Sequence, residues 1–351
     1  MSPSISVENC RGEFRYLRQV YHEIDLNGPP IQTDGWSGNV AQAEWPFMGL
    51  VYHGYSCANL AQFDPHSKTE ALVELKWVIG ALQTPRLTGF VAPHFGEPFG
   101  DPKSRPAVFV HGHWLNLAVK YRKISGDMSF DPLIQAIASR LHRGFLEAPE
   151  GILPSYPDMY WLTDNFAALA ALQRYDQIFG SKLGRVKVDA LSSIKRRFLD
   201  ADTGMLSTYV DPKGGRSLQG PRGVAQMYGL HFLWDFDALF AREQYERAQT
   251  HLILNSHGVA AVREFPKGVE GRPDIDSGPV IFGLGASASG FALAAAVNAE
   301  DWKTVEGLLQ ALNGVGGAAW EGDRLRFTRM PAVGQAVILY GKTLLLKPSS
   351  Q

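Results

Sequence analysis

The chain has 351 residues, of which 45% are hydrophobic and 20% are charged, and its formal net charge at pH 7 is −1. This balance, without a basic stripe, argues against a nucleic-acid-binding protein, while the apolar content is ample for one large core or two smaller ones. Two cysteines, Cys10 and Cys57, are too few for a disulfide framework or a cysteine-based zinc site.

Apolar residues at a spacing of three to four dominate the chain and predict twelve helices. In chain order the predicted helices are 11–22, 42–62, 68–83, 108–125, 130–146, 163–179, 183–198, 222–237, 239–252, 283–297, 300–312 and 331–345. Very short links at Gly126-Asp127 and Gly180-Ser181 join neighbours into pairs, which makes the paired helices antiparallel. Longer Gly- and Pro-rich segments separate one pair from the next.

This alternation of short and long links predicts the fold class, an all-α (α/α)6 barrel or six-hairpin toroid, as a single domain over residues 1–351. An open solenoid is the alternative, but it requires polar capping repeats that the sequence does not show clearly. The nearly all-apolar helices 163–179 and 283–297 are expected inside, and helices with a charged face, such as 183–198, outside. Strand-like runs at 205–210 and 325–328 predict small β-hairpins on one rim, where the long links gather and carry function.

The most informative motif runs from Asp274 and Asp276 into a segment built almost wholly of Gly, Ala and Ser. Small residues let backbones approach closely, and the two carboxylates stand where free N–H groups begin a helix. The motif is therefore typical of a tight pocket floor with an acidic lip. A capped core helix is the simpler interpretation.

A second acidic lip extends from Ser155 to Asn165 and includes Asp158 and Asp164. Thr163 or Asp164 is expected to cap the apolar helix that follows. Capping does not explain why further polar and aromatic residues share the same turn, so we expect a binding or catalytic role for this segment.

His113 is the candidate proton carrier, because a neutral imidazole facing a cavity exchanges protons near pH 7. The His111-x-His113 pair lacks a third ligand at helical spacing, which argues against zinc. Arg222 is expected either to lower the pKa of nearby carboxylates or to form a structural ion pair. The side chains expected to bind substrate are Phe47, Tyr52, Glu97, Ser155, Asp158, Tyr160, Trp161, Asn165, Arg222, Tyr228 and Asp274.

This set of groups supports acid/base chemistry at an oxygen, with Asp164 and Asp276 as the leading catalytic pair and His113 and Asp25 as helpers. No phosphate loop, nucleophile elbow, metal site or cofactor fingerprint is found. We expect a small-molecule substrate, no nucleic acid, no membrane span and a cytoplasmic location, since neither a long apolar run nor a secretory signal is seen. A homo-oligomer stays open.

The chain resembles the linalool dehydratase/isomerase family over about residues 42–300, in Gly112-His113 to Gly126, Ser155 to Asn165, Asp202-x-Gly204 and Arg263-Glu264. The resemblance implies an (α/α)6 barrel and a lyase or isomerase that acts on a small terpenoid-like or other alcohol. It also implies that His113 and Asp25 match the catalytic histidine and aspartate of that family.

Ser155 and Asp164 stand where the linalool dehydratase family has cysteines, and a carboxylate at 164 makes the site more like that of the six-hairpin glycosidases. A glycoside hydrolase with paired carboxylates and a non-catalytic ligand-binding toroid are therefore the alternatives. The distance between the carboxyl groups would separate them, because acid catalysis needs about 5–10 Å across an open cavity.

Overall fold

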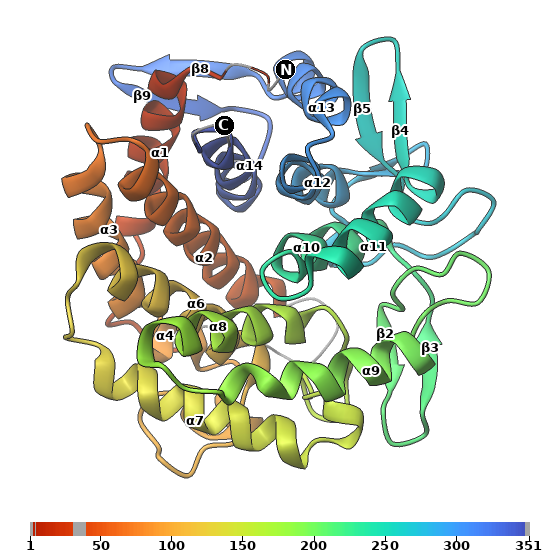
Figure 1. The fold of residues 1–351 in the computed structure, drawn as a ribbon. Coiled ribbons are helices and arrows are strands. Elements are labelled where there is room, and N and C mark those ends of the chain that lie inside the picture. Colours follow the sequence, from red (N-terminus) through yellow and green to blue (C-terminus); the bar gives the residue numbers. More distant parts are fainter. Residues whose placement is uncertain (1–2, 4, 31–39, 348–351) are drawn as a thin grey trace. The chain divides into compact units, whose positions relative to one another are not determined.

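The computed structural model describes residues 3, 5–30 and 40–347, and Figure 1 shows helices joined by loops and small hairpins. The longer helices are α1 (Val7–His22), α2 (Val40–Phe63), α3 (Lys68–Ala81), α6 (Val108–Ser125), α7 (Asp131–Glu147), α8 (Asp164–Phe179), α9 (Lys187–Arg197), α10 (Gly223–Leu233), α11 (Ala238–His251), α12 (Ala286–Asn298), α13 (Trp302–Val315) and α14 (Ala332–Leu344). The short helical turns are α4 (Pro85–Thr88), α5 (Ala92–Phe95), η1 (Pro149–Gly151), η2 (Leu183–Val186) and η3 (Ile275–Ser277).

Each predicted helix has a counterpart whose ends lie within about one helical turn of the predicted ends. The short links also match, since Gly126 (φ 75°) and Gly180 (φ 66°) end α6 and α8 in the left-handed conformation that favours glycine. The helical turns α4 and α5 were not predicted. Each has four residues, which is too few for periodicity to reveal.

The chain divides into two compact units, and the first comprises residues 1–90, 253–263 and 272–351. In this unit α14 packs between α2 and α12. Each of these three helices has a partner that covers it: α3 on α2, α1 on α14 and α13 on α12. Helices from the two ends of the chain thus form one core.

The second unit comprises residues 91–252 and 264–271. Here α8 packs against both α6 and α10, while α7 covers α6 and α11 covers α10. Every residue of α8 from Asn165 to Leu172 is buried, whereas α9 buries only Ala190, Leu191, Ser193 and Ile194. This contrast matches the predicted split into apolar inner helices and amphipathic outer ones.

Small antiparallel sheets decorate the helices. Their strands are β1 (Tyr160–Trp161), β2 (Tyr209–Asp211), β3 (Arg216–Gln219), β4 (Ile253–Ser256), β5 (Val259–Val262), β6 (Val280–Ile281), β7 (Leu284–Gly285), β8 (Ala318–Glu321) and β9 (Arg324–Phe327). They form the sheet β1-β2-β3 and the hairpins β4-β5, β6-β7 and β8-β9. The sequence predicted the hairpins that contain β2 and β9, but not β4-β5 or β6-β7.

Within the described ranges, none of the helices is both long and apolar enough to cross a bilayer. The expectation of one domain over residues 1–351 stays a prediction.

Candidate functional site

In the second unit, a hydrogen bond joins two buried side chains, His113 on α6 and Tyr228 on α10. The imidazole Nε2 lies 2.8 Å from the phenolic oxygen. The rings of Phe109 and Phe232 flank the imidazole with centroids at 5.4 and 5.5 Å. Burial, with a smaller contribution from the nearby His231, lowers the pKa of His113 to about 3. His113 is therefore neutral throughout the physiological range, although it is enclosed by side chains and does not line an open cavity.

Two glycines explain how α6, α8 and α10 come close enough for this contact. A Cβ at Gly112 would lie 2.9 Å from the backbone nitrogen of Ala168, and one at Gly229 would lie 2.5 Å from Cγ2 of Thr163. His113 and Tyr228 are the immediate neighbours of these glycines. The close packing of both helices onto α8 therefore sets the positions of the two functional groups.

An ion pair buried from solvent stands before α10. The guanidinium of Arg222 is 1% exposed, and its Nε donates to Oε1 of Glu264 at 2.9 Å. The backbone N–H of Gly223 donates to the carbonyl of Glu264 at 2.8 Å, so the same residue also holds the helix start. The structural ion pair foreseen for Arg222 is therefore present, with a partner that the sequence analysis did not name as a site residue.

The buried side-chain oxygens of this unit that have no hydrogen-bond partner among the described residues include Ser104 Oγ, Ser155 Oγ, Ser207 Oγ, Thr208 Oγ1 and Gln226 Oε1. Gln226 lies one turn after Arg222, and its amide donates to the carbonyl of Leu206. Because buried polar atoms are normally paired, these oxygens mark places where water or a polar ligand would bind. Only Ser155 was among the residues expected to bind substrate.

The second acidic lip has members with different surroundings. Asp164 is half-buried as the first residue of α8. Asn165 is buried, and its side-chain amide pairs with the backbone of Leu153. Its Oδ1 accepts the Leu153 N–H at 2.8 Å, and its Nδ2 donates to the Leu153 carbonyl at 3.1 Å. Asp158 is exposed at a positive φ of 54°, 3.5 Å from Nζ of Lys213. Of these three, only Asp164 has the position of a reactive carboxylate, because contacts within the chain account for Asn165 and Asp158 faces solvent.

The aromatic members of this lip sit on a strand. Tyr160 and Trp161 form β1, which pairs with β2. Tyr160 is 8% exposed, while the ring of Trp161 lies 5.8 Å from the ring of Tyr209. The two strands therefore present a pair of aromatic faces next to the start of α8.

The first acidic lip lies in the first unit. Asp274 is exposed and caps η3, accepting hydrogen bonds from the backbone N–H groups of Asp276 (3.0 Å) and Ser277 (3.4 Å). Asp276 is half-buried in the first turn of η3. The capped-helix interpretation therefore explains Asp274, and Asp276 remains the candidate for chemistry.

The other predicted residues lie in a turn, a loop and a core helix. Asp25 is exposed in the turn after α1, where its carboxylate accepts the N–H of Asn27 at 3.1 Å. Glu97 is exposed on a loop. Phe47 and Tyr52 are wholly buried in α2 and serve the core of the first unit. The expectation that carboxylates from both units share one cavity stays a prediction.

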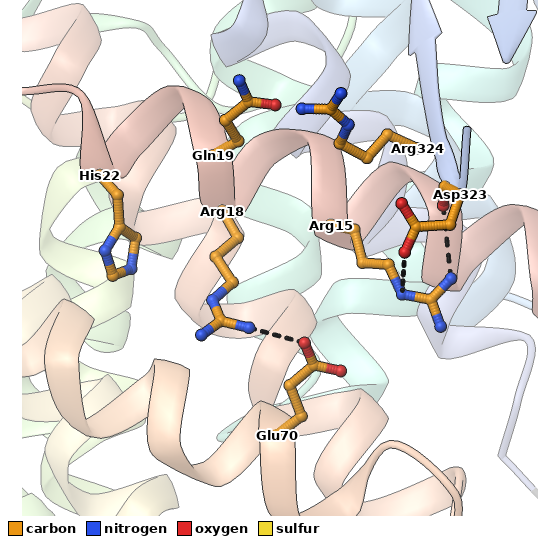
Figure 2. Close-up of a pocket in the computed structure, with 7 residues that line it drawn as sticks. All are labelled: Arg15, Arg18, Gln19, His22, Glu70, Asp323 and Arg324. Carbon is orange, nitrogen blue, oxygen red and sulfur yellow. Dashed lines mark hydrogen bonds and ion pairs between the residues drawn. The ribbon is translucent and has the colours of Figure 1, made fainter. Parts of the chain in front are cut away.

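A groove of ≈ 470 Å³ in the first unit runs along α1 and was not foreseen (Figure 2). It is lined by Arg15, Arg18, Gln19, His22, Glu70, Asp323 and Arg324. Two of its arginines are paired within it, Arg18 with Glu70 at 2.6 Å and Arg15 with Asp323 at 3.5 Å. None of the predicted site residues lines this groove.

Beneath the groove, the buried carboxylate of Glu74 joins two histidines. Its oxygens lie 2.9 Å from Nε2 of His22 and 3.1 Å from Nε2 of His53. Burial pushes the pKa of Glu74 up, but the two histidines outweigh it and the net pKa lies below the ordinary value. These residues are 21 to 52 positions apart, and no local sequence signal pointed to them.

Comparisons with known proteins give the fold class. No family model and no curated protein sequence matches the chain. A family 105 glycoside hydrolase of C. acetobutylicum is similar with a TM-score of 0.61 at 12% identity, over 95% of this chain and 99% of that one. An unsaturated glucuronyl hydrolase specific for heparin gives a TM-score of 0.61 at 14% identity, over 96% of both chains. An inactive double-aspartate variant of an α-1,6-mannanase of a Salegentibacter species, solved with α-1,6-mannotetrose, gives 0.56 at 11% identity, over 95% and 99%.

These similarities define the class of protein by its fold: the chain has the (α/α)6-barrel fold with small β-hairpins, as predicted. The resemblance to linalool dehydratase/isomerase is wrong, because the similar structures are glycoside hydrolases and nothing in them supports that family. The matched stretches have explanations within the fold, since Gly112 allows α6 to approach α8, Gly126 ends α6 and Asn165 holds Leu153. Residues that meet such packing needs recur without a shared reaction.

Proposed function

We propose that the protein is a glycoside hydrolase, which was the first alternative to the lyase or isomerase interpretation. The observation that carries the proposal is the match over nearly the full length of several chains described as glycoside hydrolases. Acid/base catalysis with carboxylates at a glycosidic oxygen is the chemistry expected from the candidate residues of the sequence. It requires one group to protonate the departing oxygen and another to activate water or attack the sugar.

Asp164 is the proposed base or nucleophile. It is half-buried at the first position of α8, where free N–H groups and the helix dipole stabilise an ionised carboxylate. The carboxylate must be ionised either to attack the sugar as a nucleophile or to take a proton from the attacking water as a base. The general acid, by contrast, must hold a proton. Asp276 is the proposed second carboxylate, since it too is half-buried at the start of a helical turn.

This chain lacks a pair of residues that the similar mannanase has. The inactive mannanase variant has two aspartates replaced at consecutive positions. This chain has no two consecutive aspartates anywhere in its sequence. The proposed catalytic pair therefore comes from separate segments, and the sugar has to be found by experiment.

The test is a panel of 4-nitrophenyl glycosides of hexoses, pentoses and hexuronic acids, together with gluco-, manno-, galacto- and xylo-tetraoses, assayed for 4-nitrophenol or reducing ends. We expect the wild type to cleave at least one class and Asp164→Asn and Asp276→Asn to lower kcat at least about a hundredfold. Asn keeps the outline of Asp, and neither Asp164 nor Asp276 is the N-cap of its helix, so each variant should lose only the charge–dipole contribution of a first-turn carboxylate, about 0.3–1 kcal/mol of unfolding free energy.

The matched control is Asp189→Asn, an exposed carboxylate in the first turn of the outer helix α9. It should keep full activity. A wild type that cleaves nothing on the panel would contradict the hydrolase proposal. An Asp164→Asn enzyme as active as the control would remove Asp164 from the mechanism.

A further inference from the structure

The turn between β6 and β7 presents an aromatic ring to solvent. The two-residue connection is Phe282-Gly283, and both residues have positive φ, 52° and 78°. The side chain of Phe282 is 96% exposed, the highest value among the exposed large hydrophobic residues described. The ring therefore makes almost no contact that would stabilise the fold.

The base of this hairpin is firmly held. The backbone N–H of Ala286 donates to the carbonyl of Pro279 at 3.0 Å, and Leu284 forms a β-bridge with Arg263. Gly278 (φ 61°) is packed so closely that a Cβ there would lie 2.9 Å from Oγ of Ser287. The three residues from Pro279 to the tip span about 10 Å at ~3.4 Å per residue. The hairpin is thus a short finger with an aromatic tip and a fixed base, and the base follows η3 directly.

Phenylalanine is a costly residue at this position. A bulky side chain at positive φ is strained by about 1–2 kcal/mol, and turns of this geometry favour Asn-Gly or Gly-Gly. Burial does not compensate, because the ring is exposed. Strain that gives no stability points to recognition by something outside the chain.

We propose that Phe282 stacks on a sugar ring of an extended oligosaccharide, one unit or more away from the bond that is cleaved. This inference rests on the proposed glycoside hydrolase function. The C–H-bearing face of a sugar ring is apolar and flat enough to cover a phenyl ring, and both lose apolar surface to water on contact. Ile275 and Ile281, 45% and 62% exposed, extend the apolar surface on the segments next to the tip.

The position of the finger indicates the class of substrate. Asp276, the proposed catalytic carboxylate in η3, precedes the tip by six residues along the same held segment. Six residues of extended chain span up to about 20 Å, so the segment is long enough to place the ring more than one sugar unit from the carboxylate. A chain of several sugars contacts both groups, whereas a monosaccharide glycoside contacts only the carboxylate.

The experiment compares wild type, Phe282→Asn and Phe282→Trp on the 4-nitrophenyl monoglycoside and on the tetraose that the wild type cleaves. Asn suits positive φ before glycine, so Phe282→Asn removes the ring while keeping or raising Tm. We expect it to raise KM for the tetraose about tenfold, the equivalent of about 1.4 kcal/mol, with kcat and the monoglycoside kinetics unchanged. Phe282→Trp should keep the wild-type KM. Leu239→Ala, at an 85% exposed residue of α11, is the control for loss of an exposed apolar side chain and should change nothing.

Equal KM values for the tetraose in the wild type and Phe282→Asn would overturn the inference and leave the hydrolase proposal standing. A change confined to the oligomeric state, measured by light scattering, would assign the ring to a protein interface and also overturn it. A wild type without turnover would count against the hydrolase proposal. Calorimetric binding of the four tetraoses then decides, because weaker binding by Phe282→Asn would support the role of Phe282, and equal or absent binding would refute it.

Discussion

The ion pair between Arg222 and Glu264 gives the sharpest test of the energetics of the second unit. Both side chains are at most 1% exposed. Removing one partner leaves the other charge in a poorly solvated position, which typically costs 3–5 kcal/mol. We therefore expect Arg222→Met and Glu264→Gln each to lose about 3–5 kcal/mol of unfolding free energy. At ~2.1 cal/mol/K per residue, the 351-residue chain has an unfolding entropy of about 0.7 kcal/mol/K, so each variant should melt about 4–7 °C lower.

The double variant Arg222→Met/Glu264→Gln distinguishes the pair from two separate effects. With both charges gone, we expect the loss to shrink to about 1–2 kcal/mol, because replacing a whole buried pair is far less damaging than breaking it. Urea unfolding followed by circular dichroism gives the three free energies. Arg216→Met, in the exposed pair with Asp211, should cost under about 1 kcal/mol. A double variant whose loss equals the sum of the single losses would refute the reasoning.

Two further predictions concern the second unit, one on the dependence of its stability on pH and one on a substitution at Asn165. Burial lowers the pKa of His111 to about 4 and of His113 and His231 to about 3, so the unfolded chain gains protons below pH 6.5 that the folded chain does not. The contribution of these histidines to the unfolding free energy is fully present above about pH 6.5. The unfolding free energy should fall by up to about 4 kcal/mol per pH unit near pH 5. Unfolding free energies that are equal at pH 5 and pH 7 would contradict this prediction. Asn165→Ala should cost about 2–3 kcal/mol because it leaves the buried N–H and carbonyl of Leu153 unpaired. A loss of substrate affinity without a loss of melting temperature would instead restore Asn165 as a binding residue.

The helices could be predicted from the sequence because their apolar residues repeat with the helical period, and because glycines in the short links mark the ends of α6 and α8. The hairpin β4-β5 was missed although its signal was present: His257 and Gly258, with φ values of 49° and 79°, form a two-residue turn between two apolar runs. Each strand has only four residues, and so short an apolar run cannot be distinguished from the end of a neighbouring helix by periodicity.

The site was harder to predict than the fold. Asp274 was predicted to bind substrate, but its carboxylate caps η3. An Asp that accepts backbone N–H groups two and three residues later is a local turn motif, so this role could have been predicted from the sequence. The contact of His113 with Tyr228 joins residues 115 positions apart, and that of Glu13 with Lys342 joins residues 329 apart. Such pairs depend on how helices meet, and a single sequence holds no local signal for them.

The division of the chain has a consequence for synthesis on the ribosome. The second unit is contributed almost entirely by one continuous stretch, 91–252, whereas the first needs both ends of the chain. The helices α1 and α2 precede the second unit in the chain, yet the helix α14 that packs against both is made only after that unit. Contacts such as that of Asn59 with Thr343, across 284 positions, must wait until the later residue has been made. Because nascent chains form local contacts before distant ones, the inserted unit should mature first, and α1 and α2 would keep apolar faces available to chaperones until the C-terminal helices arrive.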